Sequence, residues 1–236
     1  MRKTFLTVSI LFTALVSSSL GQTPKPDKNG WISLFNGREL TGWHVREAET
    51  PNNWKVVDGV YSNNPPSVDI MTDADYYDFQ LHVEFNVAKG ANAGVYMRDK
   101  YEIQIFDSFG QPPSLTAAGA LYRKIAPAVN AAKPAGEWQS YDMTFIGQRL
   151  TVWHNGQKVL DNVVVGPTGT GHASKRPDGP GPLRLQGDHG AVSFRNVRIR
   201  PLSKAQAEKL QKQMDKQSSK ATKAPSAVSA ERSSVA

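Results

Sequence analysis

Residues 94–107 show the clearest alternation of apolar and polar side chains in this chain. Successive side chains of a β-strand point to opposite faces, so the pattern predicts two strands joined by a tight turn. One face is apolar and suited to a core, with Val95, Met97, Tyr101, Ile103 and Ile105. The other face carries Tyr96, Arg98, Glu102 and Gln104. Polar side chains gathered on one sheet face indicate either a solvated surface or a bound polar ligand, and the pattern alone leaves both open.

Turn signals divide the rest of the chain into short strands. Asn-Gly or Asp-Gly pairs stand at 36–37, 58–59 and 155–156, and Asp188-His189-Gly190 forms a fourth signal. Such pairs between alternating runs are typical of hairpins. Strands are predicted over 54–61, 78–87, 139–146, 150–160, 183–186 and 192–200. No helical period runs through residues 22–202, so we predict an all-β, two-sheet antiparallel sandwich of the jelly-roll type.

Two long segments interrupt this spacing of strands. Residues 110–136 are rich in Pro, Ala and Gly, and residues 166–182 are dense in Gly and Pro. Long loops in a compact domain are usually functional or disordered. We expect both to border the polar sheet face.

The two ends of the chain differ from its body. Arg2 and Lys3, an apolar run over 5–16, and small residues at Ser19 and Gly21 predict a signal peptide over residues 1–21. The body, 22–202, is long enough for one domain, and residues 203–236 form a Lys/Ser/Ala-rich tail expected to be solvated, disordered or partly helical over 204–217. The apolar run is short for a membrane span. We therefore predict an exported protein, periplasmic or extracellular in a bacterium.

Charge and composition remove several classes of function. The net charge is +7, but most of it lies in the first three residues and the tail. The near-neutral body lacks the basic surface that nucleic acid requires. The chain has no cysteine, which excludes disulfides and thiolate metal sites, and its five histidines lack metal-binding spacing. We expect no cofactor and no metal, with a structural calcium ion as the alternative that has no sequence signature.

Other side chains are candidates for contact with a ligand. His189 lies in a turn close to Gln186, and Trp138 is one of five tryptophans that could stack on a sugar ring. Tryptophans more often anchor a core. The chain has no phosphate-binding loop and no nucleophile elbow.

Several motifs together resemble the 3-keto-disaccharide hydrolase family. They include the opening segment 31–43, Gly94-Val95-Tyr96-Met97-Arg98, Tyr101-Glu102-Ile103-Gln104, Leu183-Arg184-Leu185-Gln186 and the closing segment 194–200. The resemblance covers about residues 30–201. It implies a concanavalin-A-like jelly roll whose concave face holds a small carbohydrate, and cleavage of glycosidic bonds in sugars oxidised at C3.

Such a sugar can be cleaved by elimination followed by hydration, which needs a base, an oxyanion partner and an acid. Glu102 is the candidate base and Arg98 the oxyanion partner. Gln104, Gln186 and Tyr96 are candidates for binding the substrate, and Tyr122 or His189 for protonating the leaving group. The alternative is direct hydrolysis by two carboxylates, with Asp107 or Glu137 as the second acid.

Two alternatives to an enzyme stay open. The same fold can serve as a non-catalytic carbohydrate-binding module, and the Lys-rich tail could attach a structural envelope protein to a surface. An Arg98–Glu102 ion pair that only braces the hairpin is the corresponding structural interpretation of the motif.

Overall fold

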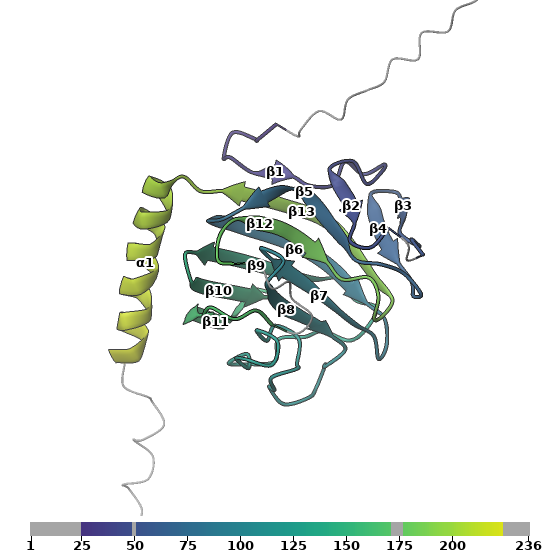
Figure 1. Cartoon of the computed structure of the whole chain (residues 1–236). Coiled ribbons are helices and arrows are strands. Elements are labelled where there is room, and N and C mark those ends of the chain that lie inside the picture. Colours follow the sequence, from purple (N-terminus) through teal and green to yellow (C-terminus); the bar gives the residue numbers. More distant parts are fainter. Residues whose placement is uncertain (1–24, 49–50, 171–176, 224–236) are drawn as a thin grey trace, which may run out of the picture.

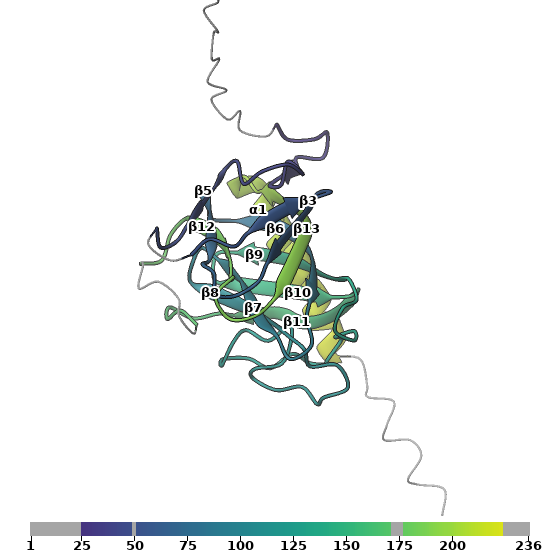
Figure 2. The same ribbon diagram turned by 90° about the vertical axis from the view of Figure 1, so that its right-hand side faces the viewer.

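The protein is an antiparallel two-sheet sandwich, as the alternation of residues predicts. The computed structural model describes residues 25–48, 51–170 and 177–223. The signal peptide predicted over 1–21 and the end of the tail, 224–236, lie outside the described residues. Figure 2 shows the two sheets edge-on, the smaller one on the left and the larger one on the right.

The larger sheet has eight strands in the order β11-β10-β9-β6-β13-β4-β3, and β1 also pairs with β13. Their bounds are β1 Ile32–Ser33, β3 Lys55–Val57, β4 Val60–Asn63, β6 Phe79–Val87, β9 Gln139–Ile146, β10 Arg149–His154, β11 Gln157–Val164 and β13 Val192–Pro201. The smaller sheet has five strands in the order β2-β5-β12-β7-β8. Their bounds are β2 Trp43–Val45, β5 Ile70–Tyr76, β12 Gly181–Leu185, β7 Asn92–Met97 and β8 Tyr101–Phe106. Figure 1 labels these strands.

The core lies between the two sheets. Strand β6 has five inward side chains that are at most 1% exposed, at Phe79, Leu81, Val83, Phe85 and Val87. The facing strands β7, β8 and β12 contribute the apolar set predicted from 95–105, together with Leu183 and Leu185. Burial of this apolar surface is the main force that holds the sheets together.

The hairpin between β10 and β11 confirms its turn signal. Asn155 and Gly156 have φ of 50° and 79°. A type I′ turn needs positive φ at both central positions, and Asn-Gly is the pair that adopts it most readily.

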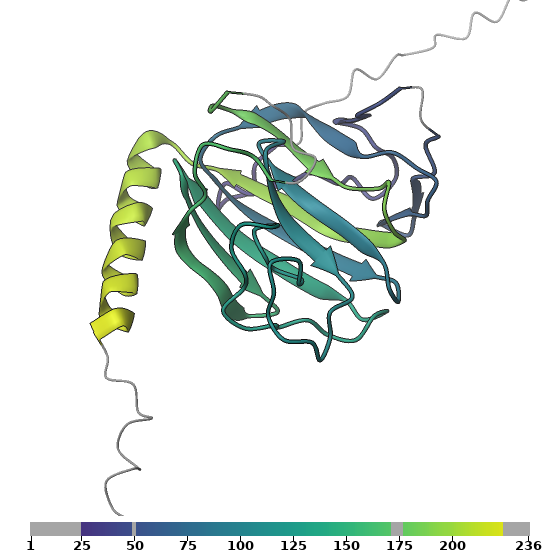
Figure 3. The ribbon, with the colours of Figure 1, turned by 60° about the horizontal axis from the view of Figure 1, so that its bottom comes forward.

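The irregular segment between β8 and β9 covers an edge of the smaller sheet. Its residues 119–122 pair with β8, through hydrogen bonds from the Gly119 N–H to the Gln104 carbonyl and from the Tyr122 N–H to the Glu102 carbonyl. The edge of β8 is therefore not open to solvent. Figure 3 brings this segment forward, in teal below the sheets.

The tail contains a longer and better packed helix than its composition indicates. Helix α1 spans Lys204–Lys223. Ala207 and Met214 pack against Ile146 of β9, and the Asn162 side chain of β11 donates to Asp215 at 2.8 Å. The prediction of a partly helical tail is confirmed, and the helix extends to Lys223 rather than ending at residue 217 and lies beside β9–β11 (Figure 1). No helix among the described residues is long and apolar enough to cross a membrane.

Candidate functional site

Two rows of side chains cross the outer face of the five-stranded sheet. The register aligns Val45, Ile70, Leu185, Val95 and Ile103 across the five strands, and all of them face the core. The positions on either side therefore point outward. The first outward row is His44, Met71, Arg184, Tyr96 and Glu102. The second is Arg46, Asp69, Gln186, Gly94 and Gln104.

Glu102 lies at the β8 end of the first row, and its carboxylate leans over Gly94 in the second. A Cβ atom on Gly94 would lie 2.6 Å from Glu102 Oε1. The Glu102 side chain is almost completely buried, and its Oε2 has no hydrogen-bond partner among the described residues. Burial raises the pKa of Glu102 from 4.5 to about 7, although a hydrogen bond with Tyr96 opposes the shift. A carboxyl group with this pKa can accept or donate a proton at neutral pH.

Gln104 and Gln186 flank the carboxylate on either side of Gly94. Each is 3% exposed, and the side-chain oxygen of each has no partner in the described part of the chain. The Gln104 amide nitrogen donates to Asn92 Oδ1 at 2.9 Å. Buried polar atoms are normally hydrogen-bonded, so three unpartnered oxygens around one glycine indicate a place for a polar ligand.

Arg184 lies at the centre of the first row. Its Nη1 lies 2.9 Å from Asp69 Oδ2, and its Nε lies 2.8 Å from Asp99 Oδ1. Its guanidinium carbon is 3.6 Å from the centre of the Tyr96 ring. This stacking fixes the tyrosine whose hydroxyl meets Glu102. Neither Arg184 nor Asp69 is among the site residues predicted from the sequence, although the Leu-Arg-Leu-Gln alternation over 183–186 indicates an outward-facing arginine.

Arg98 is not part of this face, so the expectation that it lies beside Glu102 is wrong. Strand β7 ends at Met97, and Arg98 and Asp99 have φ of 54° and 50°. The alternation of a strand does not continue through such a turn. The Arg98 side chain instead enters the space between the sheets, donates to the carbonyls of Tyr77 at 2.9 Å and Gly147 at 2.8 Å, and lies 3.8 Å from the centre of the Phe145 ring.

The Arg98–Glu102 ion pair considered from the sequence is also wrong. The nearest acidic partner of Arg98 is Asp78, at 3.7 Å. Its side chain is 2% exposed, and its hydrogen bonds to the Tyr77 and Gly147 carbonyls direct it away from the outer face.

Asp107 and Trp138 also lie away from the two rows. Asp107 accepts a hydrogen bond from the Gly90 N–H at 2.9 Å and so closes the turn before β7. The Trp138 ring lies 4.0 Å from the guanidinium of Arg195, on the outer face of the larger sheet. Glu137 is exposed in the loop before β9. The structure therefore brings neither Asp107 nor Glu137 to Glu102 as a second carboxylic acid.

Tyr122 and His189 do lie at the border of the face. The Tyr122 backbone is bonded to Glu102, and its side chain is half-buried. His189 is in the turn after β12, beside the Asp188 carboxylate, and its charge favours the ionised form of Glu102.

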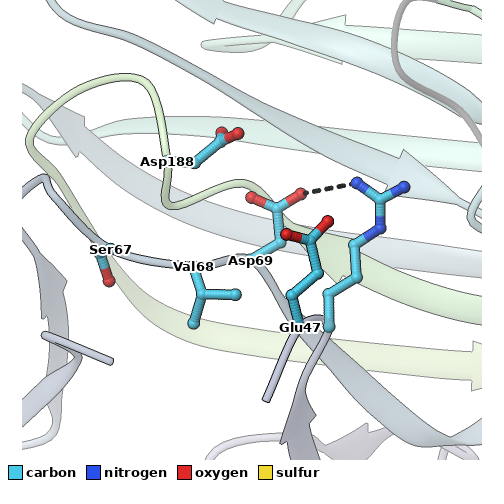
Figure 4. A pocket seen from close by; sticks show the side chains of 6 residues that line it. Glu47, Ser67, Val68, Asp69 and Asp188 are labelled. Carbon is cyan, nitrogen blue, oxygen red and sulfur yellow. Dashed lines mark ion pairs between the residues drawn. The ribbon is translucent and has the colours of Figure 1, made fainter. Parts of the chain in front are cut away.

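A small pocket opens at the other end of the second row. Its volume is about 130 Å³, and it is lined by Arg46, Glu47, Ser67, Val68, Asp69 and Asp188. Figure 4 shows the Glu47 and Asp69 side chains close together, with Asp188 on the neighbouring loop and the ion pair between Asp69 and Arg46 drawn as a dashed line. Among the described residues, no group of three or more His, Asp or Glu side chains could hold a metal ion.

Comparison with known proteins agrees with this architecture. A family model described as a 3-keto-alpha-glucoside-1,2-lyase-like domain matches residues 30–200. The chain is 24% identical over 231 residues to a 3-keto-disaccharide hydrolase of Bacteroides thetaiotaomicron, covering 75% of this chain and 80% of that protein.

Two solved structures from Parabacteroides distasonis, both described as candidate glycosyl hydrolases, have the same fold. One is 29% identical with a TM-score of 0.61, covering 76% of this chain and 90% of its own. The other is 24% identical with a TM-score of 0.64, covering 74% and 95%. These similarities support a glycosidase-like, carbohydrate-active protein. Because the family model spans most of the chain, the protein belongs to the family of 3-keto-alpha-glucoside-1,2-lyase-like domains.

Proposed function

We propose that this protein cleaves the glycosidic bond of 3-keto-glycosides by elimination, with Glu102 as the base. The observation that carries the proposal is the Glu102 carboxylate itself. It is buried and has a pKa near 7, its Oε1 lies over Gly94, and its Oε2 has no hydrogen-bond partner among the described residues. A base with this pKa is matched to removing a proton at neutral pH.

The ketone at C3 makes the proton on C2 acidic. Glu102 takes that proton, and the electrons of the broken C–H bond form an enolate whose charge rests on the C3 oxygen. When the enolate collapses, the bond from C1 to the leaving oxygen breaks, and that oxygen receives a proton from His189 or Tyr122. Water then adds across the new double bond to give the free 3-keto sugar.

The surrounding side chains suit the other steps of this route. The amides of Gln104 and Gln186 can hold the C3 oxygen and neighbouring hydroxyls, which is the role first expected of Arg98. Arg184 adds a fixed positive charge close to Glu102. Preorganised charges and dipoles of this kind stabilise a developing oxyanion. Direct hydrolysis by two carboxylates receives less support, because Asp107 and Glu137 lie elsewhere.

The test compares turnover of 3-keto-trehalose and trehalose by the purified protein and two variants. Glu102→Gln keeps the shape of the side chain but removes the base, and we expect it to lower kcat by about 10³-fold. Glu84→Gln, the same change on the outer face of the other sheet, serves as the control and should retain activity.

Cleavage that survives Glu102→Gln would reject Glu102 as the base. Equal cleavage of trehalose would reject elimination, which depends on the ketone. Saturable binding of either sugar without any cleavage would favour the carbohydrate-binding module.

We also propose that the protein is exported, from the pattern of residues 1–21. Expression in a Gram-negative host should yield a mature protein that begins at Gln22. Recovery of the intact chain from the cytoplasm would contradict export.

A further inference from the structure

The pocket at Arg46 and Asp69 lies in the same row as Gly94, over which the Glu102 carboxylate leans. Asp69 precedes β5, Gln186 follows β12, and Gly94 belongs to β7, so Asp69 is two strands from the glycine. Neighbouring strands are about 4.8 Å apart, which places the two positions about 10 Å from each other. A disaccharide is long enough to span this distance.

The lining of the pocket suits a neutral ring with several hydroxyl groups. Arg46 supplies hydrogen-bond donors, and Glu47 and Asp188 supply acceptors, while Val68 offers a small apolar surface. Asp69 is 4% exposed and already lies between Arg184, at 2.9 Å, and Arg46, at 3.8 Å. The acceptor Asp69 is therefore held rigidly, which lowers the entropic cost of binding.

Gln186 lies between the pocket and Gly94. Its buried side-chain oxygen has no partner in the part of the chain that the structure describes. A ligand that reached from Gly94 to Asp69 would pass directly over this amide.

We propose that this pocket binds the second ring of the substrate, the neutral sugar that departs when the glycosidic bond breaks. The inference rests on the proposed function, since it assigns the ring over Gly94 to the reacting 3-keto sugar. Asp69 is paired with Arg184 and Arg46, and the other two carboxylates around the pocket, Glu47 and Asp188, would repel an acidic ring. The pocket thus selects disaccharides whose leaving sugar carries no charge.

The first experiment compares two substrates, 3-keto-trehalose and a methyl 3-keto-glucoside, which lacks a second ring. Arg46→Met removes hydrogen bonds that only the disaccharide can make, so the ratio of kcat/KM for the disaccharide to that for the methyl glycoside should fall about tenfold. Arg38→Met, at an exposed arginine outside both rows, should leave the ratio unchanged. An unchanged ratio in Arg46→Met would overturn the second-ring site.

The second experiment uses the unmodified protein. A 3-keto-disaccharide with a uronic acid as its leaving ring should have a kcat/KM at least about tenfold lower than its neutral counterpart. Equal rates would overturn the proposed selection against charge.

A binding measurement distinguishes the failure of this inference from the failure of the proposed function. If the protein cleaves neither keto substrate, elimination fails, and calorimetric titration with trehalose then tests the pocket by itself. Weaker trehalose binding by Arg46→Met than by Arg38→Met would retain the pocket as a sugar site, and equal binding would reject it.

Discussion

At the scale of single residues, Gly94 makes room for the reactive carboxylate. The glycine is in the middle of a strand, where it offers no side chain to pack. Its neighbours in the row, Gln186 and Gln104, are buried, and the space that a side chain at position 94 would need lies between them. The Glu102 carboxylate fills this space.

Gly94→Ala should therefore lower activity more than stability. The new methyl group would displace the end of the flexible Glu102 side chain, and a misplacement of about 1 Å can reduce kcat by about 10²-fold. The melting temperature should change by only a few degrees. Activity of the variant at the level of the parent protein would show that the position of the carboxylate is not critical, and Gly94→Ala in the Glu102→Gln background should add little further loss.

Tyr96 sets the pH at which Glu102 works. Its hydroxyl favours the ionised carboxylate and so lowers the pKa of Glu102. Tyr96→Phe removes that hydrogen bond, so the pKa should rise and the acid limb of the kcat/KM profile should move from about 7 to higher pH. Tyr76→Phe, on β5, is the matched control and should leave the limb in place. If the acid limb does not move in Tyr96→Phe, the group that produces it is not Glu102.

At the scale of elements, the β7–β8 turn changes the role of Arg98. Two successive residues with positive φ end the strand one position before the arginine. The side chain then crosses to the core side and joins this turn to the loops at Tyr77 and Gly147. Arg98 is thus a structural link between the two sheets.

Arg98→Met should destabilise the fold while leaving the chemistry of folded molecules almost unchanged. Loss of several hydrogen bonds made by a buried charged group should lower the free energy of unfolding by about 3 kcal/mol. Denaturant unfolding and kcat per folded molecule measure the two effects. A large loss of kcat with unchanged stability would restore a direct role in catalysis.

Helix α1 shows how a sparse pattern can still direct packing. Its apolar positions 207, 210 and 214 have the spacing of one helix face, although charged and amide residues surround them. Ile146 and Leu202 complete the small cluster beneath the helix. A Lys-rich sequence therefore forms a helix that packs against the larger sheet.

At the scale of the whole molecule, burial of Glu102 makes stability depend on pH. The pKa of Glu102 is near 4.5 in the unfolded chain and about 7 in the folded protein. The folded state holds the proton of Glu102 more tightly than the unfolded chain does. Glu102 therefore adds to the free energy of unfolding below pH 4.5, and this contribution is lost as the pH rises through 7. The difference in pKa corresponds to about 3 kcal/mol.

Glu102→Gln should consequently stabilise the protein at pH 8 more than at pH 5. The amide avoids the cost of burying this carboxyl group, which in the parent protein grows as the pH rises above about 4.5 and is complete above about pH 7. Thermal or denaturant unfolding at both pH values measures the difference. A stabilisation equal at the two pH values would show that Glu102 titrates normally in the folded protein.

The local pattern of residues determined the class of fold and the chemistry of one hairpin. Alternation placed Val95, Ile103 and Ile105 in the core and Glu102 and Gln104 on the other face, because side-chain direction within a strand depends only on position. The Asn155-Gly156 turn was predictable for a similar reason, since backbone strain selects that pair.

Only the tertiary structure decided which distant residues meet. Asp69, Gln186 and Gly94 share a row because three strands that are remote in sequence pair in one register, and no local rule specifies that register. At Arg98 the local pattern itself gave a wrong prediction, because two residues of positive φ interrupt the alternation of side-chain directions. Periodicity predicts the direction of a side chain within an element, whereas turns and strand order decide what that side chain touches.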